Sequence, residues 1–272
     1  MSSAPTTETV QNRMGDEGRN PMLSIIVCLY SNYGQFESTL KSLRALPKDS
    51  FEVVVSDSSS DSAPTQRLIA EINLEAQVEY LWEEPRGVYP AINAGLKKAT
   101  GKWIYVLHSG DRLIEGSLSV LMSELQAAQT EIVLCKTLCM GNNKPLFKSH
   151  ASKDSIFWPH QGVVVRADVH RKLGAYDERY QIVADQIFFH AIRDCYKVSF
   201  LPLAIAEYDL RGLSSRIDLR VRKEFWLVRK LYGVDPVTNF IWSYARPIIR
   251  GLIDRYLSPR LVDMYLKRKY GE

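Results

Sequence analysis

The chain has 272 residues, 46% of them hydrophobic and 24% charged, which is the composition of an ordinary globular protein with room for one large domain. No apolar run reaches the roughly 18 residues that a membrane-spanning helix requires. The net charge of +4 is unevenly spread, because residues 211–272 carry 14 Lys/Arg against 6 Asp/Glu, so this basic end is expected to meet something anionic.

The first 21 residues are polar and contain no apolar core, which predicts a disordered leader and not a signal peptide. The four cysteines form no CxxC pair and no cluster with histidine at zinc spacing, so buried free thiols in a reducing compartment are expected. We therefore expect a cytoplasmic protein, either free or attached to the cytoplasmic face of the inner membrane.

Strands and helices alternate between residues 22 and 136. Short apolar runs predict buried strands at LSIIVCLY, FEVVVSD, VEYLW, WIYVL and EIVLCK. Helical spacing of apolar residues predicts helices between them, at residues 33–46, 62–72, 88–99 and 117–127. This alternation predicts an α/β domain with a mostly parallel sheet and helices on both faces.

The pattern is less regular after residue 137. A short strand at NNKPLFK, a strand at HQGVVVR, helices at ADVHRKLG and at residues 184–195, and one or two strands in KVSFLPLAIAEYDL are predicted to complete a second half of the domain, residues 137–210. The remaining segment, 211–272, is interpreted as a basic amphipathic extension that is helical from residue 217, with breaks near Gly233–Pro236 and Ser258–Pro259.

Sheets of this kind bind ligands at the carboxyl ends of their strands. Polar and acidic residues follow four predicted strands, at Tyr30–Asn32, Asp57, Glu83–Gly87 and His108–Asp111. Each could be a turn or a helix cap by itself. Together, on one rim of the sheet, they predict a ligand site.

Three acids are candidates for chemistry, and each has a structural alternative. Asp57 could accept a hydrogen bond from a nucleobase, or Asp57 or Asp61 could cap the next helix. Asp111 could bind a metal ion against a phosphate, or close a turn after Ser-Gly. Asp185 could be a general base above a pocket, or an acid favoured in the first turn of its helix.

Common nucleotide-binding and hydrolase motifs are absent. There is no GxGxxG after the first strand, no GxxxxGK[ST] and no GxSxG. These absences argue against a dinucleotide oxidoreductase and a P-loop NTPase.

Four segments in order resemble family 2 glycosyltransferases: SIIVCLYSNYGQFESTLKSLRAL, FEVVVSDSSSD, RGVYPAINAGLKKATGKWIYVLHSGD and YDERYQIVADQIFFHAI. Within that family they look most like the branch that builds bacterial surface polysaccharides such as colanic acid. The resemblance covers roughly residues 22–210. It implies a GT-A nucleotide-diphospho-sugar transferase fold with a nucleotide-sugar-binding half at residues 22–136 and an acceptor half after it. It also implies inverting transfer to an acceptor hydroxyl.

The resemblance implies roles for individual residues. It assigns the general base to Asp185 and the metal ligand to Asp111. His108 could ligate Mn²⁺ or bind a phosphate, or could be a structural histidine beside the sheet edge. Acceptor contacts are assigned to His160 and Gln161. Contacts to the donor nucleotide and sugar are assigned to Cys28, Tyr30, Asp57, Asn93, Ser109 and Gly110. Arg86, at the end of the third predicted strand, could neutralise the diphosphate of the donor, and as a lone arginine it could equally be a solvated loop residue.

The sequence departs from the family pattern at three positions. Ser56 stands where the family has its first acid, His108 stands where the branch often has Asn, and Pro90 stands where it often has Asp. These departures put the sugar specificity in question. One carboxylate, at Asp111, is still sufficient for a divalent cation (Mn²⁺ or Mg²⁺) that keeps waters and takes substrate phosphate oxygens. UDP-sugar is the expected donor because it is common in the family.

The extension carries an apolar stripe, Phe240, Tyr244, Ile248, Leu252 and Tyr256, with Arg246 and Arg250 on another face. This pattern is typical of a helix packed on the domain or on a subunit partner, or of a helix lying on an anionic membrane near a lipid-linked acceptor. No aromatic-basic motif in the sheet region supports nucleic-acid binding.

Two rival functions remain. A sugar nucleotidyltransferase would need a Gly-rich basic loop after the first strand, which LYSNYGQF lacks. A non-catalytic nucleotide-sugar binder or assembly protein is conceivable from Ser56 and His108, but the retention of all three candidate acids argues against it.

Overall fold

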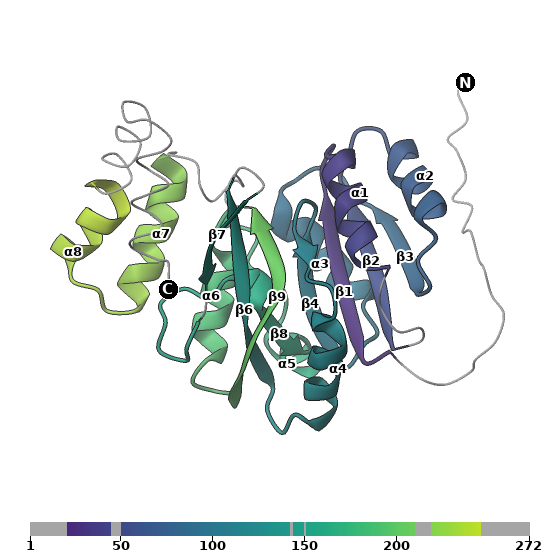
Figure 1. Cartoon of the computed structure of the whole chain (residues 1–272). Coiled ribbons are helices and arrows are strands. Elements are labelled where there is room, and N and C mark those ends of the chain that lie inside the picture. Colours follow the sequence, from purple (N-terminus) through teal and green to yellow (C-terminus); the bar gives the residue numbers. More distant parts are fainter. Residues whose placement is uncertain (1–20, 45–49, 142–143, 150, 210–218, 246–272) are drawn as a thin grey trace.

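The structure is a computed structural model that describes residues 21–44, 50–141, 144–149, 151–209 and 219–245 (Figure 1). The predicted leader and the last part of the predicted extension, residues 246–272, lie outside the described residues. Within the described residues the sheet has nine strands, ordered β3-β2-β1-β4-β8-β6-β9-β5, with β7 paired to β6. The strands are β1 (Leu23–Leu29), β2 (Phe51–Asp57), β3 (Gln77–Trp82), β4 (Trp103–His108), β5 (Arg112–Leu113), β6 (Ile132–Gly141), β7 (Lys144–Ser149), β8 (Val163–Arg166) and β9 (Val198–Asp209).

Helices cover both faces of this sheet (Figure 1). The helices of the described residues are α1 (Tyr33–Ser42), α2 (Ala63–Ile72), α3 (Val88–Lys98), α4 (Ser117–Ala127), the 3₁₀ turn η1 (His160–Gly162), α5 (Ala167–Leu173), α6 (Ala184–Ile192), α7 (Leu219–Leu231), α8 (Pro236–Phe240) and the π-helical turn η3 (Ile241–Ala245). The α/β class predicted from the alternating pattern is confirmed. No helix in the described part of the chain combines the length and apolar character needed to cross a bilayer.

The parallel strands β3, β2, β1 and β4 form one half of the sheet. The antiparallel strand β8 then joins β4 to β6, and β9 runs parallel to β6. Six of the nine described strands therefore point the same way, which agrees with the predicted mostly parallel sheet; β5, β7 and β8 are the exceptions. In the register, Cys28 of β1 pairs with Ser56 of β2 and with His108 of β4, so these three strands end at one level.

The hydrophobic core has two layers, one on each face of the sheet. Residues alternate between them along β1: Ile25 and Val27 belong to the layer that includes α1 and α4, whereas Ile26 and Cys28 belong to the layer that includes α3 and α6. Every residue of β1 is buried, as expected for a strand covered on both sides. This explains why the strand reads as a continuous apolar run.

Helix α3 lies very close to β1 at Gly95. A Cβ atom added to Gly95 would be 2.6 Å from the Cγ2 atom of Ile26. Only glycine allows this spacing, which sets the position of α3 and of the residues at its N-terminal end.

Several predicted boundaries differ from the structure. Helix α1 ends at Ser42, with residues 45–49 outside the description, and α6 ends at Ile192, three residues early. The start of the strand predicted at HQGVVVR is the turn η1. Its Gly162 lies so near β6 that an added Cβ would be 2.7 Å from the carbonyl oxygen of Cys135, so a turn is favoured there by packing between distant segments. The two-residue strand β5 has no sequence signal of its own and forms by pairing with β9.

The C-terminal helices α7 and α8 lie beyond the β6–β7–α6 end of the molecule, far from β3 (Figure 1). Helix α7 is described from Leu219, since residues 210–218 lie outside the described residues, and the predicted break near Gly233–Pro236 falls between α7 and α8. These two elements are helical, and the bounds and basic amphipathic character of the whole extension stay a prediction.

Candidate active site

The loop after β4 is built around Gly110 and Thr39. Gly110 has φ of +106°, a conformation that favours glycine. The hydroxyl of Thr39 accepts a hydrogen bond from Gly110 N–H at 3.0 Å and donates to the Asp111 carbonyl at 2.7 Å. Asp111 N–H also donates to the His108 carbonyl at 2.9 Å. Helix α1 thus holds the loop that carries the predicted metal ligand.

Asp111 and Gln161 come together at this rim, although they are 50 residues apart in sequence. The Asp111 side chain is buried, and its Oδ2 accepts a hydrogen bond from Gln161 Nε2 at 2.8 Å. The hydroxyl of Tyr105 donates to the Gln161 carbonyl at 2.9 Å and fixes η1 against β4. A predicted metal ligand and a predicted acceptor residue therefore form one unit.

Asp57 ends β2 and is fully buried. Its Oδ1 accepts from Ser59 N–H at 2.8 Å and its Oδ2 accepts from the Tyr80 hydroxyl at 3.2 Å. Asp57 therefore holds the turn after β2 and does not cap α2, whose first residue, Ala63, donates its N–H to Asp61 Oδ1 at 3.0 Å. Beside it, the hydroxyls of Ser56 and Ser58 are buried and lack a hydrogen-bond partner among the described residues. Buried hydroxyls are normally satisfied, so they leave room for a ligand or water contact here. The nucleobase role of Asp57 stays a prediction.

The other predicted donor residues fall into two groups. Tyr30 is 67% exposed and Arg86 is also exposed, 3.9 Å from Glu83. Cys28 and Asn93 are buried.

The two buried residues have roles in packing. Burial raises the pKa of the Cys28 thiol to about 12, so the thiol stays protonated. The amide of Asn93 binds the backbone N–H and carbonyl of Tyr176, both at 2.9 Å. Asn93 therefore ties α3 to the loop before α6.

Asp185 lies in the first turn of α6 and is 7% exposed. Its Oδ1 is 2.8 Å from the hydroxyl of Tyr89, and its Oδ2 accepts from Gln186 Nε2 at 2.8 Å. Nδ1 of His160 is 3.7 Å from the same Oδ2. Burial raises the pKa of Asp185, and the hydrogen bonds from Tyr89 and Gln186 oppose this rise. A carboxylate with a raised pKa is suited to take up a proton.

Tyr89 has one hydroxyl hydrogen and two oxygen neighbours. Its oxygen is 2.7 Å from the carbonyl of Ile182 and 2.8 Å from Asp185. When Asp185 is ionised, both neighbours are acceptors and compete for one hydrogen. When Asp185 is protonated, it can donate to Tyr89 while Tyr89 donates to Ile182, so the contact persists in both protonation states of Asp185.

Two histidines connect the Asp111 loop with Asp185. The rings of His108 and His160 are 5.6 Å apart and edge to face. Burial lowers the pKa of His108 to about 4 and that of His160 to about 3, so both rings are neutral at pH 7. His160 Nε2 also lies 3.1 Å from the hydroxyl of Tyr176. The candidate metal ligand, acceptor residue and base are therefore linked by direct contacts.

The sequence did not point to Tyr89, Tyr176 or Gln186. The sequence contained one indication that Gln186 belongs to the site, because it is a polar residue in a largely apolar helix. It donates to Asp185 and to the Trp158 carbonyl, and accepts from Trp158 N–H. Nothing in the sequence marked Tyr89 or Tyr176 as site residues, because a buried aromatic residue is usually part of the core.

The metal-binding capacity of the rim is modest. Among the described residues, no three of His, Cys, Asp and Glu gather into a ready metal site. Asp111 and the neutral ring of His108 are the donors at the strand end. This set fits a divalent cation that keeps waters and is completed by substrate phosphate oxygens, and does not fit a closed structural metal cage.

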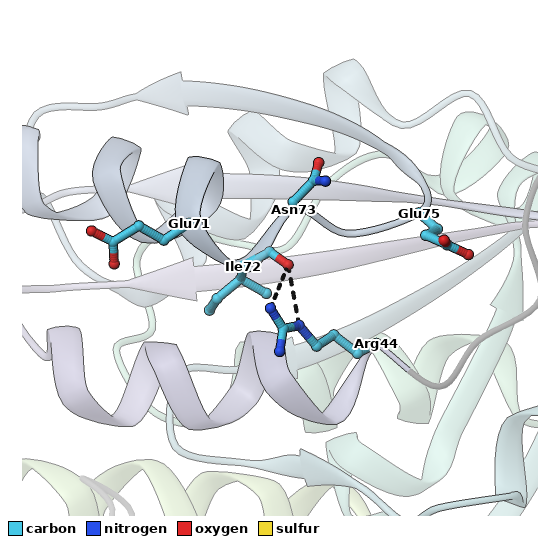
Figure 2. Close-up of a pocket in the computed structure, with 5 residues that line it drawn as sticks. All are labelled: Arg44, Glu71, Ile72, Asn73 and Glu75. Atoms are coloured by element: carbon cyan, nitrogen blue, oxygen red, sulfur yellow. Dashed lines mark hydrogen bonds between the residues drawn. The ribbon is translucent and has the colours of Figure 1, made fainter.

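A separate hollow is lined by Arg44, Glu71, Ile72, Asn73 and Glu75 (Figure 2). Nε and Nη2 of Arg44 donate to the Ile72 carbonyl at 3.1 and 2.9 Å. These bonds give a hydrogen-bond partner to a carbonyl at the C-terminal end of α2. Because α1 and α2 run back toward the strand starts, the hollow lies at the opposite end of the sheet from Asp111. It contains none of the predicted site residues.

The chain is similar to known glycosyltransferases. The family described as "Glycosyl transferase family 2" matches residues 24–190. A "PGL/p-HBAD biosynthesis glycosyltransferase" of Mycobacterium bovis is 26% identical over 255 residues, which cover 86% of this chain and 95% of that protein.

Solved structures show the same fold. TarS 1–349 of S. aureus in complex with UDP-GlcNAc has a TM-score of 0.63 at 18% identity, covering 88% of this chain and 76% of that one. This chain spans 38% of the longer TarS chain. The mannosyltransferase PcManGT of Pyrobaculum calidifontis, in complex with GDP-Man and Mn²⁺, has a TM-score of 0.62 at 16% identity, covering 95% and 82% of the two chains. These likenesses confirm the predicted GT-A fold, and the match over residues 24–190 shows that the chain belongs to glycosyl transferase family 2.

Proposed function

We propose that this glycosyltransferase transfers a sugar, with inversion, from a nucleotide-diphosphate donor to a hydroxyl of a saccharide or lipid-linked saccharide. We favour a UDP-sugar as the donor and surface polysaccharide synthesis as the setting. The observation that carries the proposal is the buried Asp185, whose raised pKa and contact with Tyr89 suit a general base.

The chemical step is an in-line displacement at the anomeric carbon. The acceptor oxygen attacks as Asp185 removes its proton, and the bond to the leaving diphosphate breaks on the opposite side. The proton remains on Asp185, where Tyr89 can accept a hydrogen bond from it. A well-placed base contributes about 10²–10⁴-fold to the rate.

The leaving diphosphate needs compensation for its negative charge. Asp111, with His108 beside it, would hold a divalent cation, and such an ion supplies electrostatic stabilisation of the leaving group. The presence of Mn²⁺ in the PcManGT complex supports this choice of cofactor. The Gln161 amide holds Asp111 from the acceptor side and so orients the carboxylate.

The nucleotide preference is a separate question. Solved relatives of this fold bind UDP-GlcNAc in one case and GDP-Man in the other, so both bases are compatible with the fold. We keep UDP as the proposal because the family resemblance favours it. The exposed Tyr30 and Arg86 are the proposed contacts that the donor can reach most easily.

We also propose that the protein attaches to an anionic membrane through its C-terminal helices. Helix α8 and η3 expose Val237, Phe240, Ile241 and Trp242, which we call the apolar patch. Tyr244, in contrast, packs against Trp226 and Phe240, with ring centroids 6.0 and 5.7 Å apart. The rest of the predicted stripe, beyond residue 245, lies outside the described residues. Exposed aromatic residues near a basic segment favour an interfacial position, where the acceptor would be lipid-linked.

The test uses the purified full chain with UDP-GlcNAc, UDP-glucose and GDP-mannose in the presence of Mn²⁺. Release of nucleoside diphosphate and transfer to added saccharides are measured for the wild type, Asp185→Asn and the control Asp194→Asn, an exposed acid just beyond the same helix. We expect Asp185→Asn to lose about 10²–10⁴-fold in turnover, while the control keeps wild-type turnover.

Three outcomes would contradict the proposal. Wild-type turnover in folded Asp185→Asn would show that Asp185 is not the general base. Nucleotide binding without turnover of any donor would favour a non-catalytic binder. Formation of pyrophosphate from a nucleoside triphosphate and a sugar phosphate would favour a nucleotidyltransferase.

A further inference from the structure

Three consecutive backbone N–H groups immediately before α6 share one acceptor, the carboxylate of Glu224 in α7. Gln181 N–H donates to Oε1 at 3.0 Å, and the N–H groups of Ile182 and Val183 donate to Oε2 at 2.8 and 3.2 Å. Val183, the N-cap residue of α6, makes no side-chain cap hydrogen bond. A carboxylate from another helix therefore holds the three residues that lead into α6. Hydrogen bonds to a charged acceptor are stronger than neutral ones, and an anion is favoured at a helix N-terminus.

The loop that Glu224 holds also contacts the candidate base. The Ile182 carbonyl and the Val183 N–H belong to one peptide unit. Glu224 binds the N–H side of that unit, and Tyr89 binds the carbonyl side at 2.7 Å. The same Tyr89 hydroxyl lies 2.8 Å from Asp185. A continuous set of direct contacts thus runs from α7 to the carboxylate in α6.

Helix α7 is packed against the acceptor side by rings and cations as well. Phe225 lies edge to face with Phe157, with ring centroids 5.5 Å apart, and Arg229 stands 5.1 Å from the Phe157 ring. Phe157 precedes Trp158, whose backbone N–H and carbonyl are both bound by the side chain of Gln186. Helix α7 therefore supports both segments that flank Asp185, and Glu224 does not depend on one flexible contact for its position.

We propose that Glu224 is a positioning residue for the candidate base: its carboxylate fixes the 181–183 loop, and the loop fixes Tyr89 and Asp185 for proton transfer. This inference rests on the proposed role of Asp185. Under this proposal, α7 contributes to catalysis by holding the loop next to Asp185. It also explains why an acid stands in a helix that carries five Lys/Arg, at positions 220, 222, 223, 229 and 230.

The test compares the full-length wild type with Glu224→Ala, Glu224→Gln and Asp185→Asn, and uses Glu115→Ala and Glu115→Gln as controls at an exposed glutamate before α4. Two readouts are needed. The first is kcat and donor KM for release of nucleoside diphosphate from UDP-GlcNAc and GDP-mannose. The second is amide hydrogen exchange of residues 181–187, which needs no substrate.

We expect Glu224→Ala to lower kcat by about 10- to 100-fold, because a small misplacement of a catalytic group costs about this much. The KM for the donor should stay within about twofold of the wild-type value, since the substitution does not touch the residues proposed to bind the nucleotide. The rate of amide hydrogen exchange should rise in residues 181–187 and stay unchanged in the rest of the chain. Glu224→Gln should give an intermediate kcat because its amide oxygen still accepts hydrogen bonds. The Glu115 variants should match the wild type in both readouts.

Some results would overturn the inference and leave the proposed function intact. They are wild-type kcat in Glu224→Ala while Asp185→Asn is inactive, or a loss of kcat accompanied by faster exchange throughout the chain. If Glu224→Ala does not fold, Glu224→Gln decides: wild-type kcat with unchanged exchange refutes the positioning role. Wild-type turnover in Asp185→Asn refutes the proposed base, and with it the positioning role, even if the exchange data show an anchored loop.

Discussion

The hydroxyl of Tyr89 lies 2.8 Å from a carboxylate oxygen of Asp185, across 96 residues of sequence. Burial raises the pKa of Tyr89 well above its ordinary value, so the hydroxyl keeps its proton and remains a donor. Its hydrogen bond stabilises the ionised form of Asp185 and opposes the effect of burial on that residue. Tyr89 thus limits how far the pKa of the candidate base can rise.

The first prediction concerns Tyr89→Phe. Without the hydroxyl, the pKa of Asp185 should rise further. A base works in its ionised form, so the acid limb of the kcat profile should move to higher pH. The loss of activity should then be larger at pH 6 than at pH 8. The neighbouring groups His108 and His160 are neutral in this range and should not mask the shift.

Turnover measured between pH 5 and pH 9 checks this, with Tyr180→Phe in the nearby loop as the control. An unchanged acid limb in Tyr89→Phe would show that Asp185 does not govern the pH dependence. An acid limb that moves to lower pH would show that Tyr89 raises the pKa of the base by accepting a hydrogen bond from its protonated form, and would contradict this prediction.

Much of the fold could be read from local pattern. Strands β1, β2 and β4 are apolar runs because they are buried on both faces, and polar residues lie at their carboxyl ends, where sheets of this kind bind ligands. Asp111 could be predicted from this position and from the family resemblance, and Asp185 from its place at the start of a largely apolar helix and from the same resemblance.

The rest depends on contacts between distant segments. The pairing of Asp111 with Gln161, of Tyr89 with Asp185 and of Glu224 with the 181–183 loop joins residues 50, 96 and 41–43 positions apart. No local periodicity carries that information. The insertion of β8 between β4 and β6 is of the same kind, since a four-residue apolar strand does not reveal its partners.

The second prediction concerns Asp111→Asn. Asparagine can still accept a hydrogen bond from Gln161, so the loop should stay folded. It loses the negative charge that would hold a divalent cation. We expect turnover to fall by roughly 10²–10³-fold, the usual cost of losing one electrostatic stabiliser of the leaving group. The requirement for Mn²⁺ should shift to higher concentrations.

Turnover as a function of Mn²⁺ concentration, and in the presence of a chelator, provides the measurement. Asp154→Asn, at an exposed acid, is the matched control. Full wild-type activity in chelator, or an identical Mn²⁺ dependence in Asp111→Asn, would be inconsistent with a metal role for this residue.

The third prediction concerns stability at acid pH. Burial lowers the pKa of His108 to about 4 and those of His160 and His170 to about 3. The unfolded chain binds these protons near pH 6.5, so the folded state loses stability as the pH falls from 6.5 toward 4. Each histidine contributes up to about 1.4 kcal/mol per pH unit in that window. The raised pKa of Asp185 acts in the opposite sense, in the range between the pKa of this residue in the unfolded and in the folded chain.

His170→Phe isolates one of these contributions. The His170 ring is stacked on Phe188, with centroids 4.6 Å apart, and its Nδ1 has no hydrogen-bond partner among the described residues. Phenylalanine preserves the stack and removes the titration. Urea unfolding at pH 7 and pH 5 should therefore show a smaller loss of stability in the variant than in the wild type. An equal loss would mean that His170 is not held neutral by burial.

The fourth prediction concerns the apolar patch. Phe240→Ser with Trp242→Ser removes two exposed aromatic side chains. If the patch enters a membrane interface, this change should weaken binding to phosphatidylcholine vesicles that contain phosphatidylglycerol by at least about tenfold, since burying one large side chain is worth about 1.5–3 kcal/mol. Flotation measures the bound fraction. Leu173→Ser, at an exposed leucine on α5, should bind as the wild type does. Equal binding by the double variant would place the lipid contact elsewhere or exclude it.

The fifth prediction compares two glycines in helices. Gly95→Ala would place a methyl group 2.6 Å from Ile26 in the core, so α3 and β1 must move apart, at a cost of about 1–3 kcal/mol. Gly34→Ala in α1 would meet no atom within 4 Å, and it should stabilise the protein by about 0.4–1 kcal/mol through the unfolded chain. Chemical denaturation of both variants gives the two free energies. Because α3 also carries Tyr89, Gly95→Ala should reduce turnover in addition to stability, whereas Gly34→Ala should leave turnover unchanged. Opposite signs of the two changes in the free energy of unfolding, together with a loss of turnover in Gly95→Ala alone, would support a role of the close approach of α3 to β1 in placing Tyr89. Equal signs, or unchanged turnover in Gly95→Ala, would contradict it.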